Sequence, residues 1–552
     1  MHAYGDVLVV VSAPLHGDGL PRKVLRLLNE RPLLSHALDI GRGVVKSNRQ
    51  VIVLTDDDEV AMWAEREGYQ AVIDERSAGE PTRAAGALFS LVVKAEVDRG
   101  TPFETIVLLE PSSPLLKAVD LAGAVETVRS GAFDSVISAS KEVHHTWLQI
   151  NGHYLPDFGR WPQAATERLY RETGGFVASC RGSVQCDRFM GRRVGMAVVP
   201  PERAITIRSP HEWWICERLL HRKRVVFVVA GTRLVGMGHI YRTLQLAHEI
   251  NNHEVIFICT RDSDLAAEVF TANRYTTLVQ GEESLTDCVL AQCPDVVIND
   301  FLDTDAEYVD GLKARGARVI NFEDLGSGAR SADLVFNEVY GDPSPAPNHR
   351  VGPDYFCIRD EFLSAPKRPF RGTPQEVLIT FGGVDEENLT SRILSLVWPE
   401  ASRRGIRLSV VTGPGYGHGA HLKTLIDRIG SPLVLQTNGT KRMSEYMARA
   451  DVAFSSAGRT LFELATMKVP AIVMACNRRE ETHPFASSHS GFCYLGCHDR
   501  VSDAELVSTF VQLLDEPNRR LQMRQCLERF NFRDGKKRVL TEIAEATGVA
   551  LD

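Results

Sequence analysis

The sequence predicts an α/β protein built from doubly wound parallel sheets. Short runs of β-branched and aliphatic residues recur along the 552 residues, and longer amphipathic segments separate most of them. Several of these runs end in glycine or in small polar residues, as in VVFVVAG, EVLITFGG and DVAFSSAG. Such alternation is typical of parallel sheets whose strands are joined by helices. We therefore expect strands and helices to alternate along the whole chain.

Two segments interrupt the alternation and predict domain boundaries. CERLLHRKR, residues 216–224, closes one series of units, and a new strand, turn and helix open directly after it. LSAPKRPFRGTPQE, residues 363–376, is rich in proline and basic residues, as linkers often are. We expect domains at 1–222, 223–370 and 371–552. The later two are similar in size, and a cleft between such a pair is a common place for a nucleotide-sugar.

Each predicted strand is a short apolar run with a polar or glycine-containing exit. In chain order we expect strands within 6–13, 50–57, 105–112, 134–140, 225–231, 254–260, 295–301, 318–324, 376–383, 407–413, 433–437, 451–458 and 471–476. From about 503 the pattern predicts helices that pack back on the third domain, and we assign them no chemistry.

Composition excludes several classes of partner. The formal net charge is −8, which does not favour nucleic acid or an anionic membrane. The longest apolar runs are of strand length and fall short of the roughly 20 residues that a membrane span needs. The opening residues lack a secretory pattern, and the 11 cysteines are scattered. We expect a cytoplasmic protein with reduced thiols and no membrane span.

The loop after the first strand is a candidate triphosphate site. Gly17, Gly19 and Pro21 shape it, and Arg22 and Lys23 put positive charge beside it. Glycines after the first strand of an α/β sheet let backbone amides point at phosphate oxygens. Alone, this pattern is a weak indication of CTP binding.

The remaining segments of the first domain strengthen that interpretation. IVLTDDDEVAMWAEREGYQAV, IVLLEPSSPLL, DSVISASKEVHHTW, RETGGFVAS and VVPPERAITIRSPHEWWICE follow in order. This set resembles the CMP-sialic acid synthetases, the cytidylyltransferases that activate nonulosonic acids, over about residues 5–220. The resemblance implies a Rossmann-type nucleotidyltransferase domain of GT-A-like fold that takes CTP, a nonulosonic acid and Mg²⁺. It also suggests a homodimer, because these synthetases are often dimers.

The same domain departs from that family at charged positions. The family's first loop reads A-R-x-G-S-K-G-L-P-x-K-N, whereas Pro14 and Asp18 stand at its arginine and lysine. Thr206 and Arg208 replace the two acids that hold magnesium in the family. Glu110, where the family commonly has glutamine, remains as a candidate for both CTP and metal. We expect a domain that binds ligand, or only packs, without ordinary CMP transfer; an active cytidylyltransferase is the alternative.

Histidine stands where a glycine-rich turn becomes a helix in VGMGHIYRT, residues 235–243. Gly236 and Gly238 allow close approach of backbone and ligand. Apolar residues from Ile240 onwards follow helical spacing, so His239 lies at a helix N-terminus, where the dipole favours a neutral imidazole. A structural cap would more naturally be Ser, Thr, Asp or Asn. We therefore predict that His239 is a base or a hydrogen-bond partner of substrate.

Other strand exits of the second and third domains carry further candidates. Asp300 follows a strand, where α/β sites collect their polar groups. Gly382 and Gly383 end another strand and are placed to admit a phosphate or a sugar. Near the end, DVAFSSAGRT leads from a strand into a helix, which predicts an anion site made of amides and hydroxyls. The residues of that turn are Ser456, Ala457, Gly458, Arg459 and Thr460, and Glu463 follows one turn later, placed to accept from ribose hydroxyls.

This combination resembles the UDP-sugar hydrolase of the pseudaminic acid pathway, a relative of the GT-B glycosyltransferases, over about residues 225–500. The motifs are G-x-G-H, the strand-end acid, F-G-G-x-D-x-x-N-L-T and the small-residue turn with its glutamate. The resemblance implies that His239 assists the water attacking the anomeric carbon and that UDP lies on the 456–460 turn with Glu463 on the ribose. It implies no metal, because amides and the helix dipole carry the charge of the leaving diphosphate.

The charged segment NRREETHPFA adds candidates and departures. Asn477 fits the family's position near the sugar, and Glu481 and His483 are further candidates for substrate contact. Arg459 stands where many relatives have a small or hydroxylated residue, and we expect it to clamp phosphate directly.

Three functions remain open from the sequence. The first is hydrolysis of a UDP-activated amino-sugar for nonulosonic acid synthesis, in one chain with a domain from the CMP-activation end of the same pathway. The second is a glycosyltransferase of surface polysaccharide synthesis, which uses the same cleft with another acceptor. The third is a non-catalytic scaffold or nucleotide sensor. An enclosed pocket favours hydrolysis, and one open to a bulky acceptor favours transfer.

Overall fold

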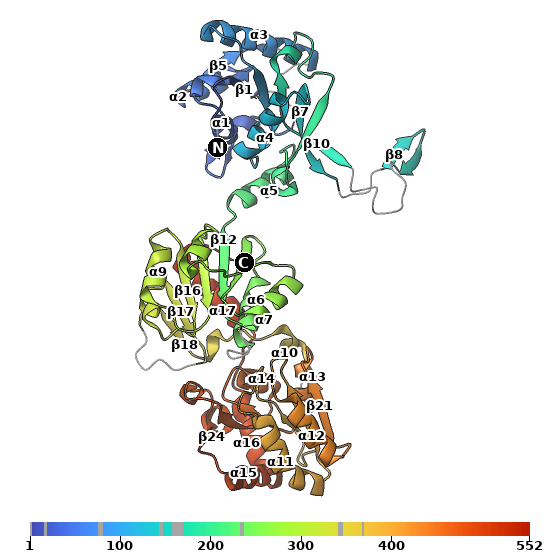
Figure 1. The fold of residues 1–552 in the computed structure, drawn as a ribbon, viewed down its shortest axis with the longest axis vertical. Coiled ribbons are helices and arrows are strands. Elements are labelled where there is room, and N and C mark those ends of the chain that lie inside the picture. Colours follow the sequence, from blue (N-terminus) through green and yellow to red (C-terminus); the bar gives the residue numbers. More distant parts are fainter. Residues whose placement is uncertain are drawn as a thin grey trace. The chain divides into compact units, whose positions relative to one another are not determined.

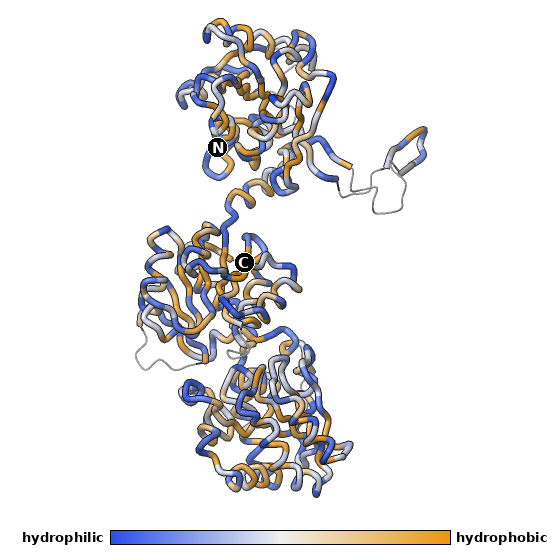
Figure 2. The backbone as a smooth tube through the Cα atoms, viewed as in Figure 1, coloured by the Kyte–Doolittle hydropathy of each residue, from blue (hydrophilic) through white to orange (hydrophobic). Residues whose placement is uncertain are grey.

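The computed structural model describes residues 3–15, 19–75, 81–142, 147–156, 169–231, 237–339, 346–366 and 369–551. Internal contacts divide the chain into two units, Met1–Arg222 and Lys223–Asp552. Each unit is described by itself (Figure 1). Within both units the hydrophobic stretches of the backbone follow the strands (Figure 2).

Unit 1 is a seven-stranded sheet of order β11-β7-β10-β6-β1-β4-β5 in which β10 runs antiparallel to its two neighbours. Its strands are β1 (Val7–Ser12), β4 (Val51–Thr55), β5 (Gln70–Ile73), β6 (Thr105–Leu109), β7 (Ser135–Lys141), β10 (Tyr170–Cys180) and β11 (Val194–Val198). Its helices are α1 (Leu33–Arg42), α2 (Asp58–Arg66), α3 (Pro81–Arg99), α4 (Ala118–Arg129) and α5 (Pro210–Leu220). Two short pairs, β2 (Leu27–Leu28) with β3 (Arg31–Pro32) and β8 (Trp147–Ile150) with β9 (His153–Pro156), lie outside the sheet.

The central strand β1 explains why its sequence reads as one apolar run. Val7, Val9 and Val11 are buried in one hydrophobic cluster, and Leu8 and Val10 are buried in another. Successive side chains of a strand point to opposite faces, so a strand covered on both faces needs apolar residues at every position.

The first half of unit 2 is a parallel seven-stranded sheet of order β14-β13-β12-β15-β16-β17-β18. Its strands are β12 (Arg224–Val229), β13 (Glu254–Cys259), β14 (Thr276–Val279), β15 (Val296–Asp300), β16 (Arg318–Phe322), β17 (Leu334–Asn337) and β18 (His349–Val351). The helices are α6 (Gly238–Ala247), α7 (Asp264–Ala272), α8 (Leu285–Leu290), α9 (Ala306–Lys313) and α10 (Asp360–Ser364).

The second half repeats the doubly wound pattern with six parallel strands, in the order β21-β20-β19-β22-β23-β24. They are β19 (Glu376–Ile379), β20 (Arg407–Thr412), β21 (Val434–Asn438), β22 (Val452–Ser456), β23 (Ala471–Ala475) and β24 (Phe492–Cys497). The helices are α11 (Leu389–Arg403), α12 (Gly419–Ile429), α13 (Met443–Arg449), α14 (Thr460–Met467), α15 (Asp503–Asp515), α16 (Pro517–Leu527) and α17 (Gly535–Thr547).

The last helix does not stay with the half in which the chain places it. Val539, Leu540 and Ile543 of α17 are buried in the same cluster as Val225 and Phe227 of β12. The expected division assigned all of 371–552 to the third domain; the structure corrects this, because the apolar face of α17 covers the sheet of the first half. The two halves of unit 2 are thereby tied by a returning chain segment as well as by the 363–376 linker.

The α/β expectation with parallel sheets is confirmed. Each strand range expected from the sequence overlaps a strand of the structure, and short strands such as β14, β17 and β18 were not anticipated. Across the described ranges, no helix has the length and apolar character needed to cross a membrane.

Candidate functional site

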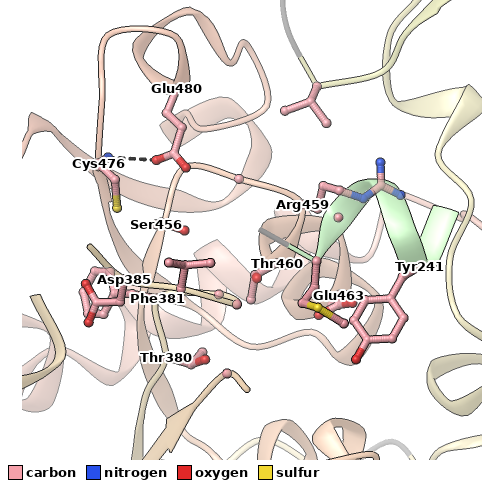
Figure 3. Close-up of a pocket in the computed structure, with 18 of the residues that line it drawn as sticks. Tyr241, Thr380, Phe381, Asp385, Ser456, Arg459, Thr460, Glu463, Cys476 and Glu480 are labelled. Atoms are coloured by element: carbon pink, nitrogen blue, oxygen red, sulfur yellow. Dashed lines mark hydrogen bonds between the residues drawn. The ribbon is translucent and has the colours of Figure 1, made fainter. Parts of the chain in front are cut away.

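A cavity of about 490 Å³ lies in unit 2 and is lined by residues of both halves. In both sheets the chain first adds strands on one side of its first strand and then crosses to the other side. The switch point therefore lies between β12 and β15 in one sheet and between β19 and β22 in the other. Ligands of doubly wound folds bind beyond the carboxyl ends of the strands at such switch points. The lining includes Met237, Gly238, His239, Tyr241, Glu323, Arg359, Thr380, Gly382, Gly383, Asp385, Ser456, Gly458, Arg459, Thr460, Glu463, Asn477, Arg479 and Glu480. Figure 3 shows ten of the lining residues labelled.

His239 and Asp300 form a buried pair at this cavity. His239 is the second residue of α6 and is 5% exposed, and Asp300 ends β15 and is fully buried. The ring nitrogen Nδ1 is in close contact with Oδ1 of Asp300. Two acceptors repel each other, so this contact requires a proton between them, and Nδ1–H donating to the carboxylate leaves Nε2 with the lone pair that a base needs.

A guanidinium keeps Asp300 ionised. Arg242, one helical turn after His239, donates from Nε to Oδ2 at 2.7 Å and from Nη2 to Oδ1 at 2.5 Å. Burial by itself would raise the pKa of Asp300, but Arg242 and His239 outweigh it and lower this pKa to about 2. Asp300 therefore remains a carboxylate that can hold the imidazole and stabilise an imidazolium.

Arg242 is shared among three carboxylates. Its Nη1 donates to Glu323 Oε1 at 2.6 Å and to Glu338 Oε1 at 2.7 Å, in addition to the bonds to Asp300. Glu323 adopts φ 52°, which is uncommon for a residue with a side chain and marks backbone strain at this position. A fully buried arginine with three acids holds the exits of β15, β16 and β17 together.

Arg459 occupies a place that the sequence did not predict. It lines the cavity, but its Nη1 is in close contact with Glu338 Oε1 and lies 3.5 Å from Glu323 Oε1. Burial and the neighbouring Arg242 lower its pKa to about 10, although Glu323, Asp300 and Glu463 act in the opposite direction. The expected phosphate clamp is thus engaged, in this structure, by carboxylates of the opposite half.

Glycines bring the two halves into contact. A Cβ added at Gly238 would lie 2.7 Å from Cδ of Arg459, and one at Gly383 would lie 3.1 Å from Cγ of Met237. The sequence predicted that these glycines admit a ligand, and both do line the cavity. The structure adds a second reason for them: the side chains of Arg459 and Met237 cross the glycine backbones. Gly236 lies outside the described residues.

The small-residue turn lies between β22 and α14. Ser456, Gly458 and Thr460 line the cavity, whereas Ala457 is fully buried and its N–H donates to the carbonyl of Met474 at 3.0 Å. The amide of Ala457 is therefore unavailable to a ligand in this structure, because it joins the neighbouring strand. The expected anion site is reduced to the remaining amides, the hydroxyls and the start of α14.

Glu463 lines the cavity together with the side chains of Arg359 and Tyr241. Arg359 donates to Glu463 Oε1 from Nε at 3.0 Å, and its Nη2 lies 2.9 Å from the same oxygen. The guanidinium also lies 5.0 Å from the ring centroid of Tyr241. Figure 3 shows Glu463 and Tyr241 at one end of the cavity, with Thr460 nearby. Glu463 retains a second carboxylate oxygen for a hydroxyl-bearing ligand.

Around NRREETHPFA the structure corrects two predictions, those for Glu481 and His483. Glu481 pairs with Arg500 and does not line the cavity, whereas its neighbour Glu480 does. Glu480 accepts from the N–H of Cys476 at 2.8 Å, and burial raises its pKa. Asn477 lines the cavity as expected, and its side-chain oxygen accepts from the N–H of Glu480 at 3.0 Å.

His483 does not line the cavity either. It is 3% exposed, and its Nδ1 lies 3.0 Å from the carbonyl of Ala457. Burial lowers its pKa to about 4, so the ring is neutral and donates to that carbonyl. The tight turn after β23 places Glu480 rather than Glu481 inward, and residue spacing alone did not reveal which of the two acids faces the cavity.

In unit 1 the loop after β1 meets the segment after β11. A Cβ at Gly19, which has φ 99°, would lie 2.8 Å from the carbonyl of Arg208. Lys23 donates to the carbonyl of Ile207 at 3.2 Å. Arg22 instead forms an exposed pair with Glu59 at 2.6 and 2.7 Å. Gly17 lies outside the described residues.

Glu110 at the exit of β6 has unusual electrostatics. Burial raises its pKa to about 7, although Lys23 and a hydrogen bond from Ser12 act in the opposite direction. Thr206, which stands where the sequence resemblance implies a magnesium acid, donates to the carbonyl of Thr173 at 2.7 Å. One partly protonated carboxylate is a poor ligand set for Mg²⁺, which prefers several hard oxygens. Among the described residues there is also no cluster of three or more His, Cys, Asp or Glu suited to a metal.

Sequence reasoning missed several members of the unit 2 site. Arg242, Glu323, Glu338, Arg359 and Glu480 were not singled out. The first three had a signal: Arg242 stands three residues after His239 on one helix face, and Glu323 and Glu338 leave strands as Asp300 does. Arg359 had none, because it comes from a loop far from any strand exit.

No protein-family model matches this chain. It is 27% identical over 272 residues to the uncharacterized protein MJ1062 of Methanocaldococcus jannaschii, a match that covers 46% of this chain and 56% of that protein. It is 23% identical over 303 residues to the spore coat polysaccharide biosynthesis protein SpsG of Bacillus subtilis, covering 52% of this chain and 88% of SpsG. The chain thus spans little more than half the length of the first of these relatives.

Solved structures show weaker likeness. MurG of Acinetobacter baumannii is 15% identical with a TM-score of 0.43, over 58% of this chain and 99% of its own. A CMP:2-keto-3-deoxy-manno-octonic acid synthetase complexed with CTP is 16% identical with a TM-score of 0.30, over 39% of this chain and 98% of its own. These values record similarity and add nothing to the fold described above.

Proposed function

We propose that unit 2 is an enzyme that acts on a nucleotide-sugar and releases the nucleoside diphosphate, with UDP as the nucleotide and water as the acceptor. The observation that carries the proposal is the buried His239–Asp300 pair, whose histidine lines the same cavity as Ser456, Gly458 and Thr460 of the small-residue turn. Cleavage of a glycosyl–diphosphate bond requires a base and an anion site at one cavity. The name of SpsG, which refers to polysaccharide biosynthesis, agrees with sugar chemistry of this kind.

In the proposed reaction His239 Nε2 takes the proton of the attacking water. The water oxygen bonds to the anomeric carbon, and the bond from that carbon to the diphosphate oxygen breaks, with its electron pair leaving on the diphosphate. Asp300 holds the imidazolium that forms, because Arg242 keeps it ionised. The Ser456 hydroxyl and the first amides of α14 receive the charge of the diphosphate, and Glu463 accepts from the ribose hydroxyls.

We infer that the substrate is an amino-sugar of the nonulosonic acid pathways and that the whole chain combines a nucleotidyltransferase-like unit with a GT-B-like pair. The motif resemblance of both units to enzymes of one pathway supports this. In unit 1, two of the five expected CTP residues support this: Gly19 lies against the carbonyl of Arg208, and Lys23 donates to the carbonyl of Ile207. We propose that unit 1 binds a nucleotide or a nonulosonic acid there, and no magnesium-dependent step is assigned to it.

The test is phosphorus NMR of the purified chain with a UDP-linked diacetamido sugar, without metal, beside His239→Ala. Free UDP and a reducing sugar formed by the wild type alone are expected. Binding of the UDP-sugar with no turnover until an acceptor sugar is added would replace hydrolysis by glycosyl transfer. A parallel sample with CTP and a nonulosonic acid tests unit 1, for which ligand binding without release of pyrophosphate is expected.

A further inference from the structure

One carboxylate oxygen in the buried cluster accepts from two arginines. Arg242 donates to Glu338 Oε1 at 2.7 Å, and Arg459 is in close contact with the same atom. Glu338 is 2% exposed, and within the described part of the chain its other oxygen, Oε2, has no hydrogen-bond partner. When Arg459 leaves, Glu338 still accepts from Arg242, which the three acids then share.

The two arginines come from different halves of unit 2. Arg242 lies on α6 and binds acids of its own half. Arg459 stands directly before α14, within the turn proposed to hold the diphosphate, and crosses Gly238 to reach Glu338. Its guanidinium also lies 4.5 Å from the ring centroid of Phe356, which leaves its edge for hydrogen bonding. Arg459 therefore lies within reach of two kinds of anion, a carboxylate and a ligand on its own turn.

We propose that Glu338 holds Arg459 in the place of a ligand phosphate, and that Arg459 exchanges Glu338 for the diphosphate when a nucleoside diphosphate binds. This inference rests on the proposed function, since it takes the Gly458–Thr460 turn as the diphosphate site. Arg459 is then a ligand-binding residue, and Glu338, which competes with the ligand for it, is a positioning residue. Phosphate favours the exchange, because a diphosphate carries more charge than a carboxylate and accepts both N–H edges of an arginine.

The exchange also changes the surroundings of His239. While Arg459 is on Glu338, Asp300, Glu323 and Glu338 face two guanidinium groups; after the exchange they face Arg242 alone. The exchange therefore leaves the three acids with one fewer positive charge, and one of them, Asp300, is the residue that contacts His239.

The experiment is calorimetric titration of the full chain with UDP. Glu338→Gln removes the competitor, so we expect UDP to bind about 3- to 30-fold more tightly, which corresponds to the loss of one charge-assisted bond. Arg459→Met is expected to weaken UDP binding about tenfold or more, and Arg459→Lys to recover part of that loss. Adding Glu338→Gln to Arg459→Met should change nothing further. The matched control is Glu542→Gln, which breaks the Arg350–Glu542 pair (2.6 Å) among residues that do not line the cavity, and UDP affinity should stay the same.

Inorganic pyrophosphate gives a second readout. It should compete with UDP in the wild type and in Arg459→Lys, and lose that competition in Arg459→Met, even if Glu338→Gln fails to fold. Weaker or unchanged UDP binding in a folded Glu338→Gln, or pyrophosphate competition that survives Arg459→Met, would overturn the exchange. Absence of UDP binding in the wild type would instead remove the proposed function itself.

Discussion

Replacing Asp300 by asparagine tests the assignment of His239 as a base. In the wild type, Oδ1 contacts both His239 Nδ1 and Arg242 Nη2, and Oδ2 accepts from Arg242 Nε. An amide has one oxygen and one NH₂ group, so either orientation turns its NH₂ towards an N–H of Arg242. If the NH₂ group of the asparagine takes the position of Oδ1, it donates to Nδ1 of His239. The ring proton of His239 then lies on Nε2, and Nε2 can no longer act as the base.

The magnitude follows from these contacts. Loss of the correct tautomer and of the carboxylate behind an imidazolium is expected to lower kcat about 10²- to 10⁴-fold, or about 3–5 kcal/mol of barrier. UDP affinity should change by less than about threefold, since Asp300 does not line the cavity. Stability should fall by about 3–5 kcal/mol, because Arg242 loses one of its buried partners.

The assay is the initial rate of UDP release, with thermal unfolding measured in parallel and ¹⁵N NMR of the histidine rings to identify the tautomer. Asp295→Asn is the matched control, because Asp295 lies directly before the opposite end of β15 and is half-exposed. A folded Asp300→Asn with kcat within tenfold of the wild type, and the ring proton still on Nδ1, would refute the reasoning.

Three further outcomes follow from packing and burial. The pKa of Glu110 is raised to about 7, so its contribution to the free energy of unfolding is complete below about pH 4.5. This contribution falls by up to about 3 kcal/mol as the pH rises through 7. Glu110→Gln should flatten this pH dependence in calorimetry of the full chain, and an unchanged pH dependence would exclude Glu110 as its source. The pKa of His483 is lowered to about 4, so the protein should lose stability as the pH falls from about 6.5 towards 4. Chemical denaturation at pH 7 and pH 5 should show this loss in the wild type and not in His483→Gln. An equal loss in both proteins would contradict the conclusion that His483 is buried as a neutral ring. Gly238→Ala places a methyl group 2.7 Å from Cδ of Arg459, so we expect about 1–3 kcal/mol of destabilisation and slower UDP release, whereas Gly372→Ala, with open space around it, should match the wild type.

The sequence determined the architecture and the main members of the site because both are written in local patterns. Doubly covered strands need continuous apolar runs, and these runs located the sheets. Parallel strands collect their exits at one edge, so residues read at strand exits, such as His239, Asp300, Gly383 and Ser456, could be expected near one another. The structure brings them to a single cavity or directly behind its wall.

Tertiary structure alone decided which partner each charged group takes. Arg459 has the same sequence context whether it faces a phosphate or Glu338, and only the approach of the two halves places that carboxylate beside it. Glu480 and Glu481 are neighbours in the chain, and the path of the turn after β23 decides that Glu480 lines the cavity. The last helix, α17, packs on the first half of unit 2 for the same kind of reason. Its apolar face can be buried against any uncovered sheet, and the uncovered sheet is the one that contains β12. The spacing of apolar residues shows that one face of a helix or strand must be buried. Which element covers that face is decided by contacts between residues far apart in the chain.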